Sequence, residues 1–339
     1  MPAFTQMEDL FRAFDQLTVL IVGDVMVDSY LWGKSTRLSP EAPVPIVNFV
    51  KAEKRLGGAG NVALNVQALG AKALLCAVIG DDPEGAELVR LLEAAGLSTA
   101  GIIHSLERTT SVKQRILSGG QQLLRIDTET EEDLVAHENH RLLARYEHLL
   151  LQTDVVIFED YDKGVLGEHN IAELISLARK KGIPTVVDPK KKNFLRYREC
   201  SLFKPNLKEL KEGLKVEFTE ANLEALEEAA SDLQQKLEIE NVLITLSERG
   251  VFCLSGADKT YIEAHLRTIS DVSGAGDTVI SIAALGMALQ LPLPLVAELA
   301  NLGGGLVCEE VGVVPVDKQK LLREALACKI AEQYLSLTL

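Results

Sequence analysis

The sequence predicts an α/β fold with a doubly wound, mostly parallel sheet and helices on both faces. Short apolar runs recur along the chain, and each ends in an acidic or polar turn, as buried parallel strands do. Segments with helical periodicity separate these runs, and this alternation is typical of a doubly wound sheet. The predicted strands are 19–24, 74–79, 155–158, 185–187 and 242–246, and the predicted helices are 61–69, 85–95, 134–150, 170–181 and 220–237.

Acidic or polar residues stand at the carboxyl end of nearly every predicted strand. Open α/β sheets bind ligands at that edge, so we expect the functional site there. The longest apolar stretch, 279–296, approaches the length of a membrane span, but it contains Ser281 and Gln290 and is interrupted by Pro292 and Pro294. A helix buried in a large core is therefore the better interpretation.

Two segments, about 29–56 and 109–127, break the alternation of strand and helix. The first has no helical period and contains three prolines, and the second alternates like a hairpin around Gly119 and Gly120. Together they predict a small second sheet that covers the site as a lid and excludes water. We expect a single domain, 1–339, with this lid inserted in it.

The composition is that of a globular protein with a sizeable core, because 47% of the residues are hydrophobic and 25% are charged. The net charge of −14 argues against nucleic acid as the main partner, although local basic side chains can still bind anionic small molecules. The five cysteines form no C-x-x-C pair, which favours free thiols in a reducing compartment. Because the sequence shows neither a signal-peptide pattern nor a membrane span, we expect a cytoplasmic protein.

The most informative motif is Asp-Val-Ser-Gly-Ala-Gly-Asp-Thr at 271–278, which is followed by small and apolar residues. A Gly-Ala-Gly turn at the start of a helix leaves backbone N–H groups unpaired, and the helix dipole makes them an anion site. Asp277 would accept a proton from a hydroxyl while the amides of Gly274, Ala275 and Gly276 stabilise a phosphoryl group in transfer. The alternative is a plain strand-to-helix turn capped by an aspartate.

Three further patterns suit a ligand that carries sugar hydroxyls and a phosphate. The glycine run before Asn61 lets the backbone approach a polyhydroxyl ligand, and the carboxylates of Asp24 and Asp28 suit adjacent hydroxyls. Basic side chains of the lid hairpin could clamp a substrate phosphate, namely Lys113, Arg115 and Arg125. The alternatives at these positions are a helix-entry turn, strand-end caps and solvated basic residues on an exposed strand.

Asn206 and Glu209 follow a short apolar stretch and Pro205. Their oxygens could hold magnesium-bound water near nucleotide phosphates, since hard oxygen ligands suit that ion. The residues alone favour the alternative, a helix N-cap with a capping-box glutamate three residues later. The six histidines do not cluster with cysteines or carboxylates, so we expect no transition-metal site, and neither a P-loop nor the protein-kinase motifs occur.

Taken in order, the glycine run at 57–61 and the motif at 271–278 resemble those of the PfkB/ribokinase family of sugar kinases. Six further stretches span most of the chain and resemble the branch that phosphorylates D-glycero-β-D-manno-heptose 7-phosphate. They are Gly-Asp-Val-Met-Val-Asp at 23–28, Leu-Ser-Pro-Glu-Ala-Pro-Val-Pro at 38–45, Gln-Gln-Leu-Leu-Arg-Ile-Asp at 121–127, Asp-Tyr-Asp-Lys-Gly at 160–164, Val-Asp-Pro-Lys at 187–190 and Pro-Asn-Leu-Lys-Glu at 205–209. The second and third are far more specific than the general kinase motifs.

The resemblance implies a ribokinase-like kinase that uses ATP and Mg²⁺ and acts on the anomeric hydroxyl. The residues that act on the phosphoryl group would lie in one motif: the catalytic base Asp277 and the anion hole of Gly274, Ala275 and Gly276. The residues of the nucleotide site would be Asn206 and Glu209, which reach Mg²⁺ through water, Lys208, Ser247, Glu248, Gly250 and, near the adenine, Asn301. The residues that hold the sugar and its phosphate would be Asp24, Asp28, Gly58, Asn61, Lys113, Arg115 and Arg125.

Bifunctional members of this branch carry a second, nucleotidyltransferase domain, and we expect the adenylyl step to need a separate protein here. The resemblance also implies a homodimer formed through the lids, which an exposed strand edge and an apolar lid face favour. Two alternatives stay open. The chain could phosphorylate another sugar, such as ribose or a fructose-type sugar phosphate, or it could be a sugar- or nucleotide-binding sensor without catalysis, against which the intact Asp277 argues.

Overall fold

The main sheet of the protein has nine strands in the order β13-β12-β11-β10-β9-β8-β1-β4-β5. The structure, a computed structural model, describes residues 4–219 and 221–334. Neighbouring strands from β11 to β5 are parallel, whereas β12 and β13 add antiparallel pairs at one edge. The predicted doubly wound, mostly parallel sheet is therefore confirmed.

Five strands of this sheet coincide with the predicted ones. They are β1 (Thr18–Gly23), β4 (Lys72–Gly80), β8 (Val155–Glu159), β9 (Thr185–Asp188) and β11 (Asn241–Thr245). The strands that the apolar runs did not reveal are short or lie at the sheet edges: β5 (Ile102–Ser105), β10 (Leu202–Phe203), β12 (Val251–Ser255) and β13 (Asp258–Ile262). Short strands give too few residues for a clear period.

The helices that separate the strands also follow the predicted pattern. Those predicted are α2 (Ala59–Ala68), α3 (Pro83–Ala94), α4 (Ala136–Leu149), α5 (Ile171–Lys180) and α7 (Leu223–Leu237), and residue 220, included in the last prediction, lies outside the described residues. The others are α1 (Met7–Phe14), α6 (Leu207–Leu214), α8 (Ala275–Ala288), α9 (Leu293–Val307), α10 (Lys318–Ala327) and α11 (Ile330–Tyr334), with short 3₁₀ turns η1 (Leu150–Gln152) and η2 (Ser247–Arg249).

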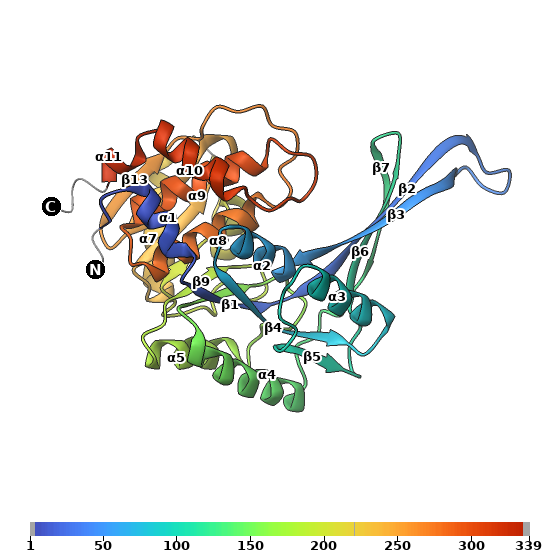
Figure 1. Ribbon diagram of the computed structural model, residues 1–339, viewed down its shortest axis with the longest axis horizontal. Coiled ribbons are helices and arrows are strands. Elements are labelled where there is room, and N and C mark those ends of the chain that lie inside the picture. The colour runs from blue at the N-terminus through green and yellow to red at the C-terminus, as the bar shows by residue number, and fades with distance from the viewer. Residues whose placement is uncertain (1–3, 220, 335–339) are drawn as a thin grey trace.

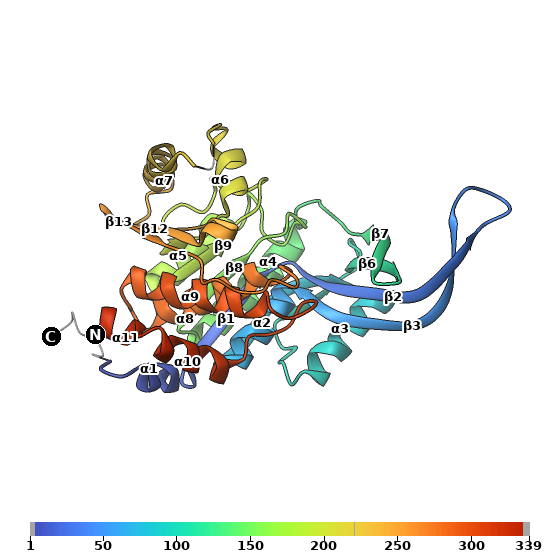
Figure 2. The ribbon, with the colours of Figure 1, turned by 90° about the horizontal axis from the view of Figure 1, so that it is seen from above.

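The helices cover the two faces of the sheet as two layers (Figures 1 and 2). Helices α1, α2, α3, α8, α9 and α10 bury their apolar side chains on one face, and α4 to α7 bury theirs on the other. Successive strand residues alternate between these cores, because side chains of a strand point to opposite faces. In β1, Val19 and Ile21 belong to the first core, whereas Leu20 and Val22 belong to the second.

A separate four-stranded sheet projects from the body of the molecule (Figures 1 and 2). Its order is β3-β2-β6-β7, built from β2 (Val25–Leu38), β3 (Pro45–Gly58), β6 (Ser111–Ser118) and β7 (Gln121–Thr128). The predicted hairpin around Gly119 and Gly120 is confirmed as the β6–β7 turn. Strand β6 pairs with β2 only as far as Gly33, so the distal part of β2 and β3 continues as a two-stranded ribbon.

Helix α8 contacts β8, β9, α2 and α9, so its first turn lies near the carboxyl ends of the central strands. The apolar stretch 279–296 forms most of α8 and the start of α9. The two helices are separate because the chain turns at Gln290, which has a left-handed φ of 55°, and at Pro292. Within the described ranges, no helix has both the length and the hydropathy needed to span a membrane.

Two glycines, Gly250 and Gly256, flank β12 and differ in how closely other backbone atoms pack against them. Gly250 has a φ of 90°, and an added Cβ would lie 2.0 Å from the Ile262 carbonyl oxygen, whereas at Gly256, with a φ of 57°, no atom lies within 4 Å. The positive φ at both positions disfavours any residue with a side chain, but only a side chain at Gly250 would also clash with the backbone. We predict that Gly256→Ala lowers the free energy of unfolding by about 1 kcal/mol and that Gly250→Ala lowers it by at least about 3 kcal/mol. Equal losses in urea unfolding would contradict this packing.

Candidate active site

Asp277 lies in the first turn of α8 and is 8% exposed. Asn61 Nδ2 donates a hydrogen bond to its Oδ2 at 2.5 Å, and the Tyr161 hydroxyl donates one to its Oδ1 at 3.2 Å. Burial raises the pKa of Asp277 to about 6, while the Asn61 hydrogen bond partly opposes this rise. A carboxylate with this pKa is ionised at neutral pH, yet it is basic enough to accept a proton from a positioned hydroxyl.

The start of α8 presents backbone N–H groups beside this carboxylate. Gly274 caps the helix in a left-handed conformation, with a φ of 83° that favours glycine. The Ala275 N–H is used within the turn, because it donates to the Val272 carbonyl at 3.3 Å. The first bond from a helical N–H back to a residue four positions earlier is that of Thr278 to Gly274. The amides of Gly276 and Asp277 therefore precede the helical ladder and can bind an anion.

Helix α2 fixes α8 through a row of buried asparagines. Asn61 and Asn65 are one turn apart, and Asn65 Nδ2 donates to the Asn61 carbonyl at 3.1 Å. Asn65 Oδ1 accepts hydrogen bonds from the Thr278 hydroxyl at 2.9 Å and from the Val316 N–H at 3.1 Å. Because buried polar groups are costly when unpaired, these bonds specify how α2 and α8 meet. The sequence pointed to Asn61 and to the 271–278 motif that contains Thr278, but it assigned Thr278 no role and did not reveal Asn65.

A buried ion pair faces the same turn of α8 from the sheet. Asp188 ends β9, and its Oδ2 lies 2.8 Å from the Nζ of Lys204, which follows β10. An added Cβ at Gly276 would lie 3.9 Å from this Asp188 oxygen and 4.0 Å from Lys204 Nζ. Burial opposes the charged form of Lys204, but Asp188, Glu209 and Glu159 more than offset it and raise the pKa of the amine. The site thus holds a fixed, buried positive charge.

Asn206 and Glu209 form the capping box of α6 that the sequence offers as the alternative to metal binding. Asn206 Oδ1 accepts from the Glu209 N–H at 2.8 Å, and Glu209 Oε2 accepts from the Asn206 N–H at 2.9 Å. Glu209 Oε1 also pairs with Lys190 Nζ at 2.7 Å, and that ammonium lies 5.3 Å from the ring centroid of Tyr161. Lys208 points outward, with its side chain 83% exposed. A magnesium role for this segment stays a prediction.

The other predicted nucleotide residues lie on the β11–β12 connection and on α9. Ser247 and Glu248 are exposed in η2, whereas Gly250, the next residue after η2, is buried. Asn301 lies in α9, and its Nδ2 donates to the Glu263 carbonyl at 2.8 Å. Contact of these residues with a nucleotide stays a prediction.

Asp24 organises the segment that carries Tyr161. Its carboxylate is 1% exposed and accepts three backbone N–H groups, from Tyr161 at 2.9 Å, Lys163 at 3.1 Å and Val165 at 3.1 Å. Both of its oxygens are therefore engaged in holding this loop. Gly58 packs against the same residue, because an added Cβ would lie 2.4 Å from the Asp24 carbonyl oxygen. A direct contact of Asp24 or Gly58 with a sugar stays a prediction.

The basic residues of the lid share one face with Asp28. Lys113 pairs in register with Asp28, and Arg115 pairs in register with Arg125. Their charges are already compensated, however. Arg115 Nη1 lies 2.5 Å from Asp28 Oδ1, Arg125 Nε lies 3.0 Å from Asp127 Oδ1, and Lys113 also pairs with Asp127 at 3.5 Å. The face is therefore mixed in charge, and a substrate phosphate would have to compete with these carboxylates.

Comparison with known proteins places the chain in a family. The model described as pfkB family carbohydrate kinase matches residues 16–319. The chain belongs to this family. The resemblance of its motifs to PfkB/ribokinase sugar kinases is thereby confirmed.

The relatives that match most of the chain are longer proteins. Bifunctional protein HldE of Syntrophotalea carbinolica is 37% identical over 95% of this chain and 66% of its own length. The protein of the same name from Citrifermentans bemidjiense is 39% identical over 94% of this chain and 65% of its own length. The chain thus spans just under two thirds of the length of these curated relatives.

Solved structures of other kinases share the fold. Phosphofructokinase-2 from Escherichia coli in complex with potassium superposes with a TM-score of 0.74 over 91% of this chain and 98% of its own, at 20% identity. Arabidopsis thaliana ribokinase complexed with ribose and ATP gives a TM-score of 0.69 over 91% of this chain and 99% of its own, at 17% identity. At these identities the likeness establishes the ribokinase-like fold alone.

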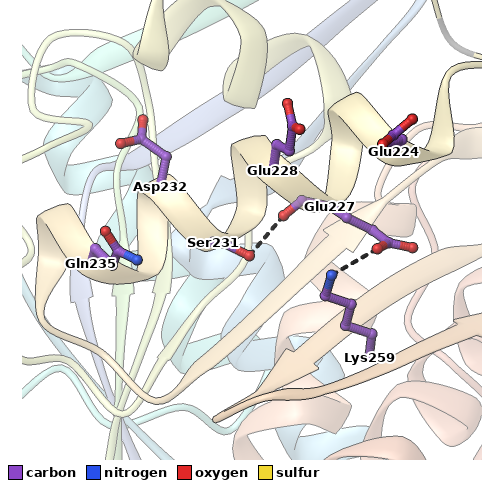
Figure 3. A pocket seen from close by; sticks show the side chains of 7 residues that line it. All are labelled: Glu224, Glu227, Glu228, Ser231, Asp232, Gln235 and Lys259. Carbon is purple, nitrogen blue, oxygen red and sulfur yellow. Dashed lines mark hydrogen bonds and ion pairs between the residues drawn. The ribbon is translucent and has the colours of Figure 1, made fainter.

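A concave surface elsewhere on the molecule does not coincide with the predicted site. This hollow lies between α7 and β13 and has a volume of about 490 Å³. Figure 3 shows the side chains that line it. Acidic side chains of α7 dominate its lining, and its single lysine, Lys259, pairs with Glu227 at 2.7 Å. An acidic surface disfavours phosphate groups. We therefore locate the candidate active site at the start of α8.

The raised pKa of Asp277 predicts how its replacement changes stability with pH. Its folded pKa of about 6 exceeds the ordinary value of 3.8, so the folded state binds the proton more tightly. This tighter proton binding adds to the free energy of unfolding. The contribution is fully present below about pH 4 and is lost as the pH rises through 6. We predict that Asp277→Asn exceeds the wild type in free energy of unfolding by roughly 1–3 kcal/mol at pH 7.5, and by much less at pH 4.5. A difference that does not change between these two urea titrations would contradict the buried, ionised state.

Proposed function

We propose that the chain is an ATP-dependent kinase of D-glycero-β-D-manno-heptose 7-phosphate, which phosphorylates the anomeric hydroxyl to give the 1,7-bisphosphate. The reaction would serve ADP-heptose formation for the lipopolysaccharide core. Family membership, the similarity to proteins named HldE and the motifs at 38–45 and 121–127 support this choice of sugar. The observation that carries the proposal is the buried Asp277 carboxylate, held by Asn61 at the start of α8.

In the proposed reaction, Asp277 accepts the proton of the anomeric hydroxyl while that oxygen attacks the γ-phosphorus of ATP. Asn61 and Tyr161 each hold one carboxylate oxygen and leave lone pairs for the substrate. The amides of Gly276 and Asp277, at the start of α8, would face the transferring group, and the ammonium of Lys204 would add a buried positive charge. Fixed donors of this kind stabilise the phosphoryl charge in the transition state.

The residues around α8 also suit a magnesium nucleotide. Mg²⁺ bound with ATP neutralises the phosphate charges, and it prefers oxygen ligands and retains several waters. The oxygens of Asn206 and Glu209 are engaged in the capping box and with Lys190, which fits contact through water rather than direct ligation. Along the nucleotide we place, as proposed, Lys208, Ser247, Glu248, Gly250 and Asn301.

The charged face of the lid would hold the sugar phosphate. Asp28 would bind sugar hydroxyls, and the 7-phosphate would take Arg115, with Lys113 and Arg125, away from their present carboxylate partners. Arginine suits this exchange because it keeps several donors in a fixed geometry. Asp24, Gly58 and Asn61 would complete the sugar site. Lid closure over this ligand would then keep water from the phosphoryl group.

The opposite face of the lid supports the proposal of a homodimer. Leu31, Ile116 and Leu124 pair in register across three strands, and Leu124 and Ile126 are 53% and 45% exposed. An exposed apolar sheet face favours a protein partner, and we propose a second copy of the chain. We further propose that 1–339 acts as one kinase domain in the cytoplasm, where ATP is available and thiols stay reduced, and that a nucleotidyltransferase acts at a later step.

The direct test is ADP formation with heptose 7-phosphate, ribose and fructose 6-phosphate as acceptors. We expect kcat/KM to be highest with heptose 7-phosphate and Asp277→Asn to reduce its turnover by about 10²–10⁴-fold with binding retained. Preference for another acceptor would overturn the proposed sugar. Wild-type turnover by Asp277→Asn would overturn the proposed base, and calorimetric sugar binding without ADP formation at any Mg²⁺ concentration would favour the sensor.

A further inference from the structure

Glu159 is a buried carboxylate that the proposed reaction does not use. It ends β8, is 1% exposed, and pairs in register with Asp188 on β9 and with Gly23 on β1. The side chain of Asp188 lies on one flank, whereas Gly23 leaves the other flank without a side chain. Among the described residues, Oε2 of Glu159 has no hydrogen-bond partner, although it is fully buried. A buried carboxylate oxygen without a hydrogen-bond partner costs free energy unless a ligand contacts it.

The charges around Glu159 are not balanced. Its electrostatic neighbours include Asp188 and Asp277, which repel it, and Lys204 and Lys190, which attract it. Glu209 joins the same cluster through its ion pair with Lys190. When all four carboxylates are ionised they share two ammonium groups, and the cluster then lacks two positive charges. That deficit equals the charge of one divalent cation, and buried carboxylates require such compensation.

The position of Glu159 is also suitable for a metal that contacts phosphates. Asp188 Oδ2 lies close to Gly276, where the free amides of α8 would receive the transferring group. Glu159 stands beside Asp188 at the same sheet edge. In the described part of the chain, no group of three or more His, Cys, Asp or Glu side chains is arranged to hold a metal. Glu159 and Asp188 are the two carboxylates in register at this edge, so phosphates and waters would have to supply the other ligands.

We propose that Glu159 is a direct ligand of a divalent cation, together with Asp188, and that nucleotide phosphate oxygens and waters complete the coordination. Magnesium in kinases is commonly bound in this way, through one or two carboxylates and the substrate phosphates. This inference rests on the proposed function, because a nucleotide must supply the phosphates. Asn206 and Glu209 would then lie outside the first coordination shell and contact the cation through water.

The test uses Mn²⁺, which takes the same oxygen ligands and can be counted by its EPR signal. The full chain is titrated with Mn²⁺ in the presence of ADP and in its absence. We expect Glu159→Gln, which keeps the size of the side chain but not its charge, to weaken Mn²⁺ binding with ADP at least tenfold. Its melting temperature without metal should stay close to that of the wild type, because Oε2 has no hydrogen bond to lose. Glu159→Ala should show the same loss of Mn²⁺ if the glutamine variant does not fold.

Asp160 provides the matched control, because it is the adjacent buried carboxylate but is fully hydrogen-bonded. Its Oδ2 accepts from the Tyr197 hydroxyl at 2.6 Å and from Asn193 Nδ2 at 3.2 Å. Asp160→Asn should bind Mn²⁺ within twofold of the wild type. Wild-type Mn²⁺ affinity in a folded Glu159→Gln, or an equal loss in Asp160→Asn, would overturn the cation site. The proposed kinase activity has a different failing outcome: the wild-type chain binds Mn²⁺ as expected but phosphorylates no sugar.

Discussion

The hydrogen bond from Asn61 to Asp277 is the contact on which the rest of the site depends. It joins α2 to α8 across 216 residues of sequence and places an ionised carboxylate where burial alone favours the neutral acid. The Asn65 bonds fix the same two helices, and Asp24 fixes the loop from which Tyr161 reaches the second oxygen of Asp277. Much of the buried polar structure therefore serves to hold one proton acceptor in one orientation.

The distribution of charge follows from the ligands that the proposed function requires. Anionic ligands at the carboxyl edge of the sheet need positive partners, yet this edge is rich in carboxylates, and Lys204 and Lys190 are held in ion pairs there. The lid shows the same arrangement, since Arg115 is paired with Asp28. Such pairs keep the basic groups ordered and compensated until a phosphate or a cation exchanges with one partner.

The central strands, most of the helices and the lid hairpin could be predicted, because buried strands and amphipathic helices leave strong periodic signals. Asp277 and Asn61 could be predicted because glycine-rich turns mark their positions. Glu159, Asp188, Lys204 and Asn65 could not be assigned, since their roles arise from the register of neighbouring strands and from helix packing. The bare sequence also showed Lys113 and Arg115 as free cations, because their acidic partners depend on cross-strand pairing. The partner of Arg125, Asp127, lies two residues along the same strand.

The most direct test is the pH dependence of kcat/KM for phosphoryl transfer to heptose 7-phosphate in the wild type and in Asn61→Ala. If Asp277 is the base, activity falls below about pH 6, where the carboxylate becomes protonated. The Asn61 hydrogen bond lowers this pKa, so its removal should move the acid limb to higher pH, while ionisation of the substrate is common to both profiles. An acid limb at the same pH in both proteins would contradict the account.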